Sequence, residues 1–357
     1  MMWAAHDATS IFDFNAATNA MNQKASIEKS VEVAQSPVAE SPVAQSPGAQ
    51  SPGANASPRV CLVVATFRHD EAVEATLRAV HEQLDSPFFK IIVVDSQATG
   101  ALSELIERQG WRDVDYISFA DNVGSARNLA ERLRLAARSG ADFAYAINHD
   151  GFADCVTVHA LLEAARGLER VGALYPLRYV PSRDQHDLTG ASAMPLPFKG
   201  RTPPAGDLVP VDWGSSNQAL YALEPIRRGL SPWSELWFGW EDMEYGWQLR
   251  QHGYSQFIAT RARAVDTYEY GRHKVLGRTV FLSDKPAWYA YYLVRNLVLM
   301  ARRGGQPRFY KLSVVFRVAL EIASTTLFRT RKTTRYRLLL RGLLDGLRNK
   351  TGKGAVP

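Results

Sequence analysis

The chain has 357 residues, of which 46% are hydrophobic and 22% are charged, so it is long enough to bury a large globular core. Its two cysteines, Cys61 and Cys155, lie far apart, which excludes a zinc-binding spacing and a disulfide framework. Residues 305–357 contain twelve Lys and Arg against two acids, Glu321 and Asp345, so the net charge of this segment is +10. The net charge of the whole chain is +6, and the remainder therefore has a net charge of −4. A basic segment on a mildly acidic body favours an anionic surface as partner, and a solvated helical face would explain it equally well.

The first 58 residues are predicted to form a disordered linker. They contain a five-residue repeat, QSPVA, ESPVA, QSPGA and QSPGA, in which the regular proline disfavours helices and central strands. We interpret the repeat as an extended segment with polyproline-II character. The opening stretch MMWAAHDATSIFDF has no basic region followed by an apolar run, so no signal peptide is predicted and a reducing, cytoplasmic compartment is expected.

Buried strands and helices alternate through the segment that follows the linker. Strands are predicted at VCLVVAT (60–66), KIIVVDS (90–96), DYISFAD (115–121) and DFAYAINHDG (142–151). Short apolar runs such as the first two are typical of strands that are buried on both faces of a parallel sheet. The alternation predicts an α/β fold in which helices cover both faces of a mostly parallel sheet.

The helices predicted between these strands have apolar residues at helical spacing. Within 71–84 the residues expected to face the core are Val73, Leu77, Val80 and Leu84. Within 122–140 they are Ala126, Leu129, Leu133 and Ala136, with Gly140 as the residue that ends the helix. A further helix is predicted within 101–111.

The pattern is less regular beyond residue 171. Residues 176–212 are rich in Pro, Arg, Asp and Gly and are interpreted as long loops with a hairpin, and a strand is predicted at 257–265. The segments 289–300 and 312–328 are strongly apolar, but charged residues interrupt both, so neither is predicted to span a bilayer. We expect both to form amphipathic helices that lie on a membrane surface.

Polar residues stand where the four predicted strands end. These residues are Thr66, Asp95, Asp121 and Asp150. Because ligands of open parallel sheets bind beyond the carboxyl ends of the strands, we expect them at one edge of the sheet. Three converging acids repel one another unless a cation or hydrogen-bond donors compensate, and a nucleotide with a divalent metal would supply both. Each acid taken alone is explained equally well as the cap of the next helix.

Asp150 is the candidate metal ligand at the end of the fourth strand. Mg²⁺ and Mn²⁺ prefer oxygen ligands and are often held by one or two carboxylates together with substrate phosphates. Asn148 would add only a neutral oxygen to such a site. The run Asn148-His149-Asp150-Gly151 is also typical of a turn.

Two adjacent carboxylates, Glu241 and Asp242, open a predicted helix in the stretch GWEDMEYGWQLRQHGY. A carboxylate within hydrogen-bond reach of a hydroxyl can act as its general base. The aromatic rings of Trp240 and Tyr245 could raise the pKa of this acid and stack on sugar rings. Acids at a helix N-terminus also complement the macrodipole, which contributes up to about 1 kcal/mol, so a structural role remains open.

The segment DWGSSNQALYAL (212–223) precedes this helix. Its small residues would let the chain approach a ligand closely, and Trp213 could flank a sugar. A simple junction between a loop and a strand explains the same composition.

Taken in order, the motifs VVATF, IIVVDS, DNVGSARN, INHD and GWEDMEYGWQLRQHGY resemble the GT-A glycosyltransferases of family 2 over about residues 59–275. The resemblance implies that Thr66 and Asp95 hold the base and ribose of a nucleotide. It also implies that Arg127 and Asn128, at the start of the helix after the third strand, face the nucleotide-sugar.

At the acceptor side, the resemblance implies that Asp242 is the catalytic base. Three further residues, Trp213, Trp240 and Glu241, are predicted to contact the acceptor. The acidic metal motif of the family falls on residues 148–150, where only the last residue is an acid, so a divalent cation, Mg²⁺ or Mn²⁺, is expected on Asp150.

The motif WEDMEYG is especially similar to the corresponding motif of galactofuranosyltransferases, in which a histidine further along the chain also binds the metal. That position holds Asp266 here, which is therefore expected as a second metal ligand, and His273 lies seven residues later. The C-terminal stretches YYLVRNLVL and RGLLDGLRNKTGK are similar to rhamnosyltransferase-like members of the same family. The two similarities imply different donor sugars.

The resemblance thus implies an inverting transfer of a sugar from a UDP- or dTDP-linked donor to a glycan or lipid-linked acceptor in cell-surface polysaccharide synthesis. Three regions are expected: a linker over 1–58, a GT-A domain over 59–285 and a basic helical extension over 286–357. We expect the extension to attach the protein to the anionic inner face of a membrane. No nucleic-acid partner is expected, because the basic segment has no recognisable reader motif.

Two other classes of function remain open at this point. Because Asn148 replaces an acid, the chain could be a catalytically silent glycan-binding or scaffold protein of the same fold. A sugar nucleotidyltransferase would need a glycine-rich phosphate loop after the first strand, and ATFRHDEAVEA contains no glycine.

Overall fold

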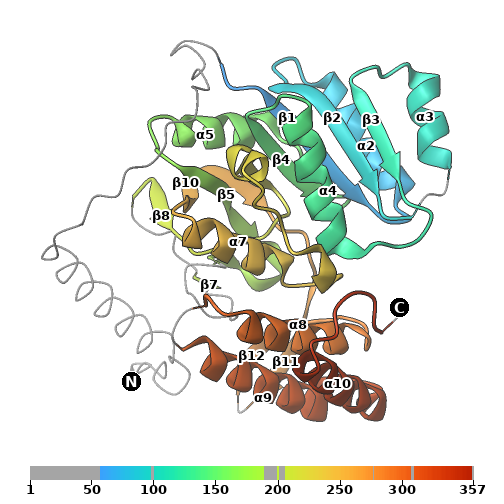
Figure 1. The fold of residues 1–357 in the computed structure, drawn as a ribbon, viewed down its shortest axis with the longest axis vertical. Coiled ribbons are helices and arrows are strands. Elements are labelled where there is room, and N and C mark those ends of the chain that lie inside the picture. The colour runs from blue at the N-terminus through green and yellow to red at the C-terminus, as the bar shows by residue number, and fades with distance from the viewer. Residues whose placement is uncertain are drawn as a thin grey trace, which may run out of the picture. The chain divides into compact units, whose positions relative to one another are not determined.

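The computed structural model describes residues 57–97, 100–188, 199–200, 206–275, 277–306 and 309–355. Residues 58–357 form one compact unit (Figure 1). The linker predicted over 1–58 lies almost wholly outside the described residues. The boundary expected at residue 285 falls inside the compact unit, between β12 (Arg278–Ser283) and α8 (Tyr289–Arg303).

A ten-stranded mixed sheet forms the centre of this unit. Its first four strands, β1 (Val60–Thr66), β2 (Phe88–Asp95), β3 (Val114–Ser118) and β4 (Phe143–Asn148), run parallel in the order β3-β2-β1-β4. The sheet continues through β9 (Ala219–Ala222), β5 (Val171–Val180), β10 (Ser255–Val265) and β8 (Leu208–Pro210). Among these, β9 and β8 are antiparallel to their neighbours. The predicted mostly parallel sheet is confirmed.

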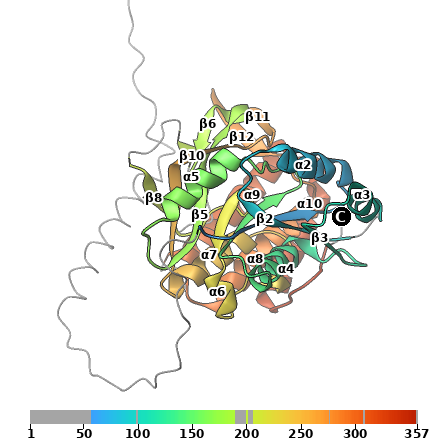
Figure 2. The ribbon, with the colours of Figure 1, turned by 90° about the horizontal axis from the view of Figure 1, so that it is seen from above.

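Helices cover both faces of the sheet, as expected (Figure 2). One face carries α2 (Asp70–Glu82), α3 (Ala101–Gln109) and α5 (Cys155–Ala165), and the other carries α4 (Gly124–Arg138) and α7 (Glu241–Gln251). Because side chains alternate along a strand, β1 contributes Leu62 and Val64 to the first face and Cys61 and Val63 to the second. Burial on both sides explains the continuous apolar run of β1.

The predicted inward faces of the helices are confirmed with one exception. The four residues expected inward on α4 are buried, and Gly140 follows this helix with φ +80°. Val73, Leu77 and Val80 of α2 are buried as well. The expectation for Leu84 is wrong, because α2 ends at Glu82 and Leu84 is fully exposed in the connection to β2.

The loop predicted over 176–212 is only partly correct. β5 continues to Val180, and Pro176 lies next to the point where its register with β10 shifts, a position that tolerates the missing N–H of proline. The expected hairpin is present, because β6 (Gln185–Asp187) folds back antiparallel on β5 through η2 (Pro181–Arg183). Residues 189–198 and 201–205 lie outside the described residues. The remaining short elements are β7 (Lys199–Gly200), α6 (Glu224–Arg227) and η3 (Ser234–Leu236).

The C-terminal part consists of a hairpin and three helices (Figure 1). The hairpin pairs β11 (Tyr270–Val275) with β12, and α8 is followed by α9 (Tyr310–Phe328) and α10 (Lys332–Leu347). The expectation that 289–300 lies on a membrane surface is wrong, since every residue of α8 from Ala290 to Met300 is buried within the protein. Within the described residues, none of the helices combines the length and the apolar character needed to cross a bilayer.

Candidate active site

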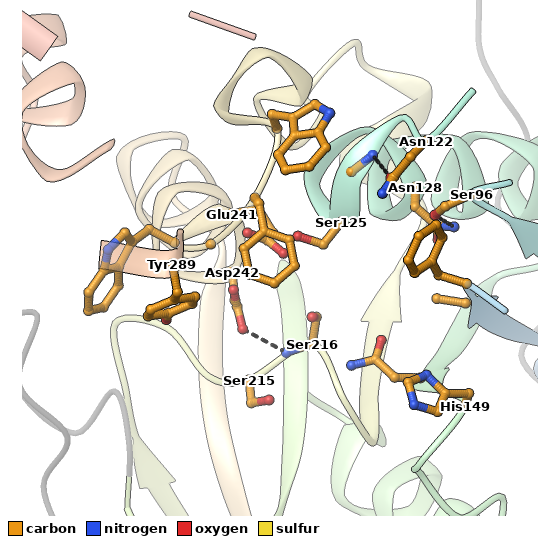
Figure 3. A pocket seen from close by; sticks show the side chains of 18 of the residues that line it. Ser96, Asn122, Ser125, Asn128, His149, Ser215, Ser216, Glu241, Asp242 and Tyr289 are labelled. Carbon is orange, nitrogen blue, oxygen red and sulfur yellow. Dashed lines mark hydrogen bonds between the residues drawn. The ribbon is translucent and has the colours of Figure 1, made fainter. Parts of the chain in front are cut away.

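A cleft of about 520 Å³ opens where β1 and β4 end (Figure 3). Seven of the ten predicted site residues line it: Thr66, Asn128, Asp150, Trp213, Trp240, Glu241 and Asp242. Asp95, Arg127 and Asp266 are not among its lining residues. Residues that are far apart in the sequence therefore share one cavity, while their individual roles stay predictions.

Asp95 lies at the end of β2, behind the wall of the cleft. Its side chain is fully buried; Oδ1 accepts a hydrogen bond from the Gln97 backbone N–H at 3.0 Å, and Oδ2 accepts one from the Tyr116 hydroxyl at 2.8 Å. Burial raises the pKa of Asp95, and the two hydrogen bonds oppose this shift. Both carboxylate oxygens thus bind the protein itself, and the neighbouring Ser96 is the residue that lines the cleft.

Thr66, at the end of β1, and Asn128, on α4, present polar atoms to the cleft. The side-chain amide of Asn128 donates to the Val94 carbonyl at 2.8 Å and to Oγ of Ser96 at 3.0 Å. Its Oδ1 and the hydroxyl of Thr66 are buried and have no hydrogen-bond partner among the described residues. Buried polar atoms without partners are rare in folded proteins, so these two atoms are candidates for ligand contacts.

Arg127 and Arg132 of α4 differ in burial and in their position relative to the cleft. The exposed Arg127 packs its guanidinium over the Phe119 ring at 5.1 Å, away from the cleft. Arg132 is fully buried, lines the cleft and donates from Nη1 to the carbonyls of Val63 at 3.3 Å and Ile147 at 2.6 Å. Burial lowers the pKa of Arg132 to about 10. Sequence reasoning missed Arg132, although it lies one helical turn after Asn128 on the buried face of α4.

A short turn at the end of β4 carries Asp150 into the cleft. Asn217 holds this turn, because its Oδ1 accepts from the Asn148 backbone N–H at 2.9 Å and its side-chain amide donates to Asp150 Oδ1 at 3.3 Å. A Cβ on Gly151 would lie 2.3 Å from Asn217 Oδ1, so glycine is required for this contact. Asn217 comes from the DWGSSNQALYAL segment and was not predicted as a site residue.

The side chains around Asp150 supply few ligands for a metal ion. His149 stacks on His69 with ring centroids 3.8 Å apart, and burial lowers its pKa. Asp266, the second predicted ligand, accepts from the Tyr268 backbone N–H at 3.0 Å through Oδ1 and does not line the cleft. In the described part of the chain, no group of three or more His, Cys, Asp or Glu could hold a metal ion. The set fits only a cation whose other ligands are donor phosphates and water.

Glu241 and Asp242 begin α7 at the opposite wall of the cleft (Figure 3). Glu241 is buried beside Ser125, whereas Asp242 is half-buried and its Oδ2 accepts from the Ser216 backbone N–H at 3.2 Å. Burial raises the pKa of Asp242. Burial, followed by the charge of Asp242, raises the pKa of Glu241 to about 7. Burial and mutual repulsion therefore make two full negative charges on this pair unfavourable.

The loop before α7 is held by two polar residues of α8. Arg295 and Asn296 interrupt the apolar pattern of this helix and are fully buried. Arg295 donates to the Leu236 carbonyl at 2.6 Å, and the Asn296 amide donates to the carbonyls of residues 236, 238 and 239 at 3.0, 2.9 and 2.9 Å. Trp237 in this loop has φ +62°, a conformation that is costly for a bulky residue. The two side chains thus fix a strained wall of the cleft.

Aromatic rings form a large part of the cleft lining. The rings belong to Trp213, Trp237, Phe238, Trp240, Trp288 and Tyr289. The indole N–H of Trp213 is buried without a hydrogen-bond partner in the described residues. Gly246 of α7 allows Trp213 to approach, because a Cβ at this position would lie 2.5 Å from Trp213 Cβ.

Two residues considered with the site lie elsewhere. Tyr245 packs in the core against Tyr221, with ring centroids 5.8 Å apart, so the expectation that it walls the acid is wrong. His273 packs against Phe328 of α9 at 4.8 Å.

The fold of the chain matches those of solved protein structures. No family model matches the chain, and no curated protein matches its sequence. A mannosyltransferase, PcManGT from Pyrobaculum calidifontis, solved with GDP-Man and Mn²⁺, has a TM-score of 0.51 at 15% identity, with 94% of this chain and 98% of that chain covered. Residues 1–349 of TarS from S. aureus, solved with UDP-GlcNAc, have a TM-score of 0.51 at 11% identity, with 82% and 81% covered. The chain has the GT-A-like fold of these glycosyltransferases.

Proposed function

We propose that the protein is an inverting glycosyltransferase that uses a nucleotide diphosphate-sugar, with a UDP- or dTDP-linked donor as the first candidate. The observation that carries the proposal is the shared cleft, which Thr66, Asn128 and Asp242 all line. The buried, unpartnered atoms Thr66 Oγ1, Asn128 Oδ1 and Trp213 Nε1 support it, because a bound ligand would complete their hydrogen bonds. The neighbouring structures support a nucleotide-sugar donor through the shared fold.

In this proposal Asp242 is the general base. A hydroxyl of a glycan or lipid-linked acceptor lies between Asp242 and the anomeric carbon of the donor and transfers its proton to the carboxylate. A bond forms from the acceptor oxygen to the anomeric carbon while the bond to the diphosphate oxygen breaks on the opposite face. A raised pKa makes Asp242 a stronger base, and general base catalysis of this kind contributes about 10²- to 10⁴-fold.

The polar environment of Asp242 assigns supporting roles to its neighbours. The Ser216 N–H orients the carboxylate through Oδ2. The raised pKa of Glu241 reduces the negative charge beside the base near neutral pH. The aromatic rings of the cleft offer flat apolar faces on which an acceptor sugar can stack.

The leaving diphosphate requires positive charge. A divalent cation, Mg²⁺ or Mn²⁺, supplies this charge as a Lewis acid when bound, and Asp150 is the cleft carboxylate that would hold it. Asn217 orients Asp150 for this role through its hydrogen bond to Oδ1. Asp266 uses only Oδ1 for the Tyr268 N–H but does not line the cleft, so we retain it as a secondary candidate.

The proposal is tested by incubating the purified protein with UDP-, dTDP- and GDP-sugars, with and without Mn²⁺, and measuring nucleotide release. Release from one donor, accelerated by an acceptor glycan, is the expected result. Binding of nucleotide-sugars without release under all conditions would instead identify a catalytically silent glycan-binding protein, a reading that Asn148 in the metal motif favours. Absence of both binding and release would refute the proposal.

We also propose that α9 and α10 attach the protein to the anionic inner face of a membrane, close to an acceptor for cell-surface polysaccharide. These helices expose large apolar side chains, among them Leu312, Val315, Leu327, Leu340 and Leu347. The same segment carries most of the basic residues of the C-terminal +10 charge. Each basic residue near an anionic surface contributes on the order of 1 kcal/mol, and the apolar side chains add burial.

The attachment is tested by co-sedimentation with liposomes that contain anionic lipid. A Val315→Asp/Leu327→Asp variant is expected to remain in the supernatant, whereas Leu84→Asp, at a fully exposed leucine outside these helices, should pellet like the natural chain. Equal sedimentation of all three proteins would show that α9 is not the attachment site.

A further inference from the structure

Lys285 is a cationic residue of the cleft that the mechanism above does not use. It lies in the connection between β12 and α8 and lines the cleft together with Asp150. Arg132, which also lines the cleft, is committed through Nη1 to backbone carbonyls. The ammonium of Lys285 lies 4.3 Å from the centroid of the Tyr268 ring and 5.9 Å from that of Tyr289, and it makes no ion pair within the described residues.

The electrostatic setting of Lys285 favours an anionic ligand. Burial lowers the pKa of Lys285, and the charges of Asp150 and Asp266 oppose this shift only in part. An ammonium that has lost water without gaining a close counter-ion is stabilised when an anion enters the cleft. Phosphate oxygens are suitable partners, because lysine binds phosphate as a compact point charge with three donors.

The backbone around Lys285 is fixed from two sides. Its N–H donates to the Ser283 carbonyl at 3.1 Å, and its carbonyl accepts a hydrogen bond from the guanidinium of Arg335 on α10. Arg335 is itself buried. The C-terminal helices therefore hold the lysine at the cleft.

We propose that Lys285 binds the diphosphate of the sugar donor and supplies, from the protein itself, part of the positive charge that a weak metal site provides incompletely. This inference rests on the proposed function. The metal motif retains one carboxylate in the cleft, so a cation held there is bound largely by the donor. A lysine beside Asp150 neutralises phosphate charge whether or not the cation is present.

The test compares nucleoside diphosphates with their nucleosides. Isothermal titration of UDP, dTDP and GDP, and of uridine, thymidine and guanosine, is carried out in EDTA on the natural chain and on Lys285→Gln, Lys285→Arg and Lys274→Gln. Lys274, exposed on β11, is the matched control for loss of one charge. Because a charged hydrogen bond contributes a few kcal/mol, Lys285→Gln is expected to weaken diphosphate binding about tenfold or more and to leave nucleoside binding unchanged. Lys285→Arg should retain most of the affinity.

Three results would overturn the inference. Unchanged diphosphate affinity in Lys285→Gln would show that the ammonium does not contact the donor. Equal losses for nucleoside and diphosphate, with a lowered thermal midpoint, would assign Lys285 a structural role only. If the natural chain binds no nucleotide with or without Mn²⁺, the proposed function fails and the inference fails with it, whereas nucleotide binding that is independent of Lys285 removes the inference alone.

Discussion

Replacing Glu241 by Gln is expected to change how the stability of the protein depends on pH. Burial raises the pKa of Glu241 from its ordinary value of 4.5 to about 7. Between these two values the folded protein binds a proton that the unfolded chain has released, so the free energy of unfolding falls as pH rises. At ~1.36 kcal/mol per pKa unit, the shift corresponds to a loss of about 3 kcal/mol between pH 4.5 and full ionisation above 7.

Urea unfolding from about pH 4 to 8 measures this loss directly, because the midpoint and slope give the free energy of unfolding at each pH. The Glu241→Gln variant should lack the part of the decline that Glu241 causes, while other buried acids with a raised pKa, such as Asp95, keep theirs, so it should gain stability relative to the natural chain as pH rises. Glu71→Gln, at an exposed position on α2, is the matched control and should keep the natural dependence. Parallel curves for the natural chain and Glu241→Gln would refute the assignment of a raised pKa to Glu241.

Two further substitutions test the walls of the cleft. Asn296→Leu removes three hydrogen bonds to the carbonyls of residues 236–239, and we expect a loss of about 2–4 kcal/mol of stability with a larger proportional loss of kcat, measured by urea unfolding and nucleotide release. Unchanged kcat would show that this loop is not part of the active site. Gly151→Ala brings a Cβ to 2.3 Å from Asn217 Oδ1 and should shift the turn that carries Asp150, so donor affinity should fall at least several-fold by titration. Unchanged affinity would remove this turn from the donor site.

The parallel half of the fold could be predicted because its signals are local. Each of the first four strands is a short apolar or alternating run, and the helices between them repeat at helical spacing. Bounds were less predictable: Leu84 keeps the helical spacing, but α2 ends two residues earlier. No strand was predicted over β5, and its second half was interpreted as a loop, because a proline inside a strand is compatible only with an irregular pairing that depends on β10, a strand about 80 residues away.

The motif residues of the site could be predicted from the sequence, whereas the residues that hold them in position could not. Motifs identified Thr66, Asp150 and Asp242, which line one cleft. Lys285 lines this cleft and Asn217 holds Asp150 within it only through tertiary packing, so no local motif identified either residue. In the sequence, Arg295 and Asn296 interrupt an apolar segment. Their role could not be predicted, because both donate hydrogen bonds to carbonyls of a loop that precedes them by more than fifty residues.

Turnover of the Asp242→Asn variant tests the central claim most directly. With a donor identified by nucleotide release, the variant should lose about 10²-fold or more in kcat while its affinity for the nucleoside diphosphate stays close to that of the natural chain. Asp121→Asn, at an exposed acid beyond β3 and outside the cleft, should turn over normally. Near-normal kcat in Asp242→Asn would contradict the account, since the proton of the acceptor hydroxyl would then have to leave by another route.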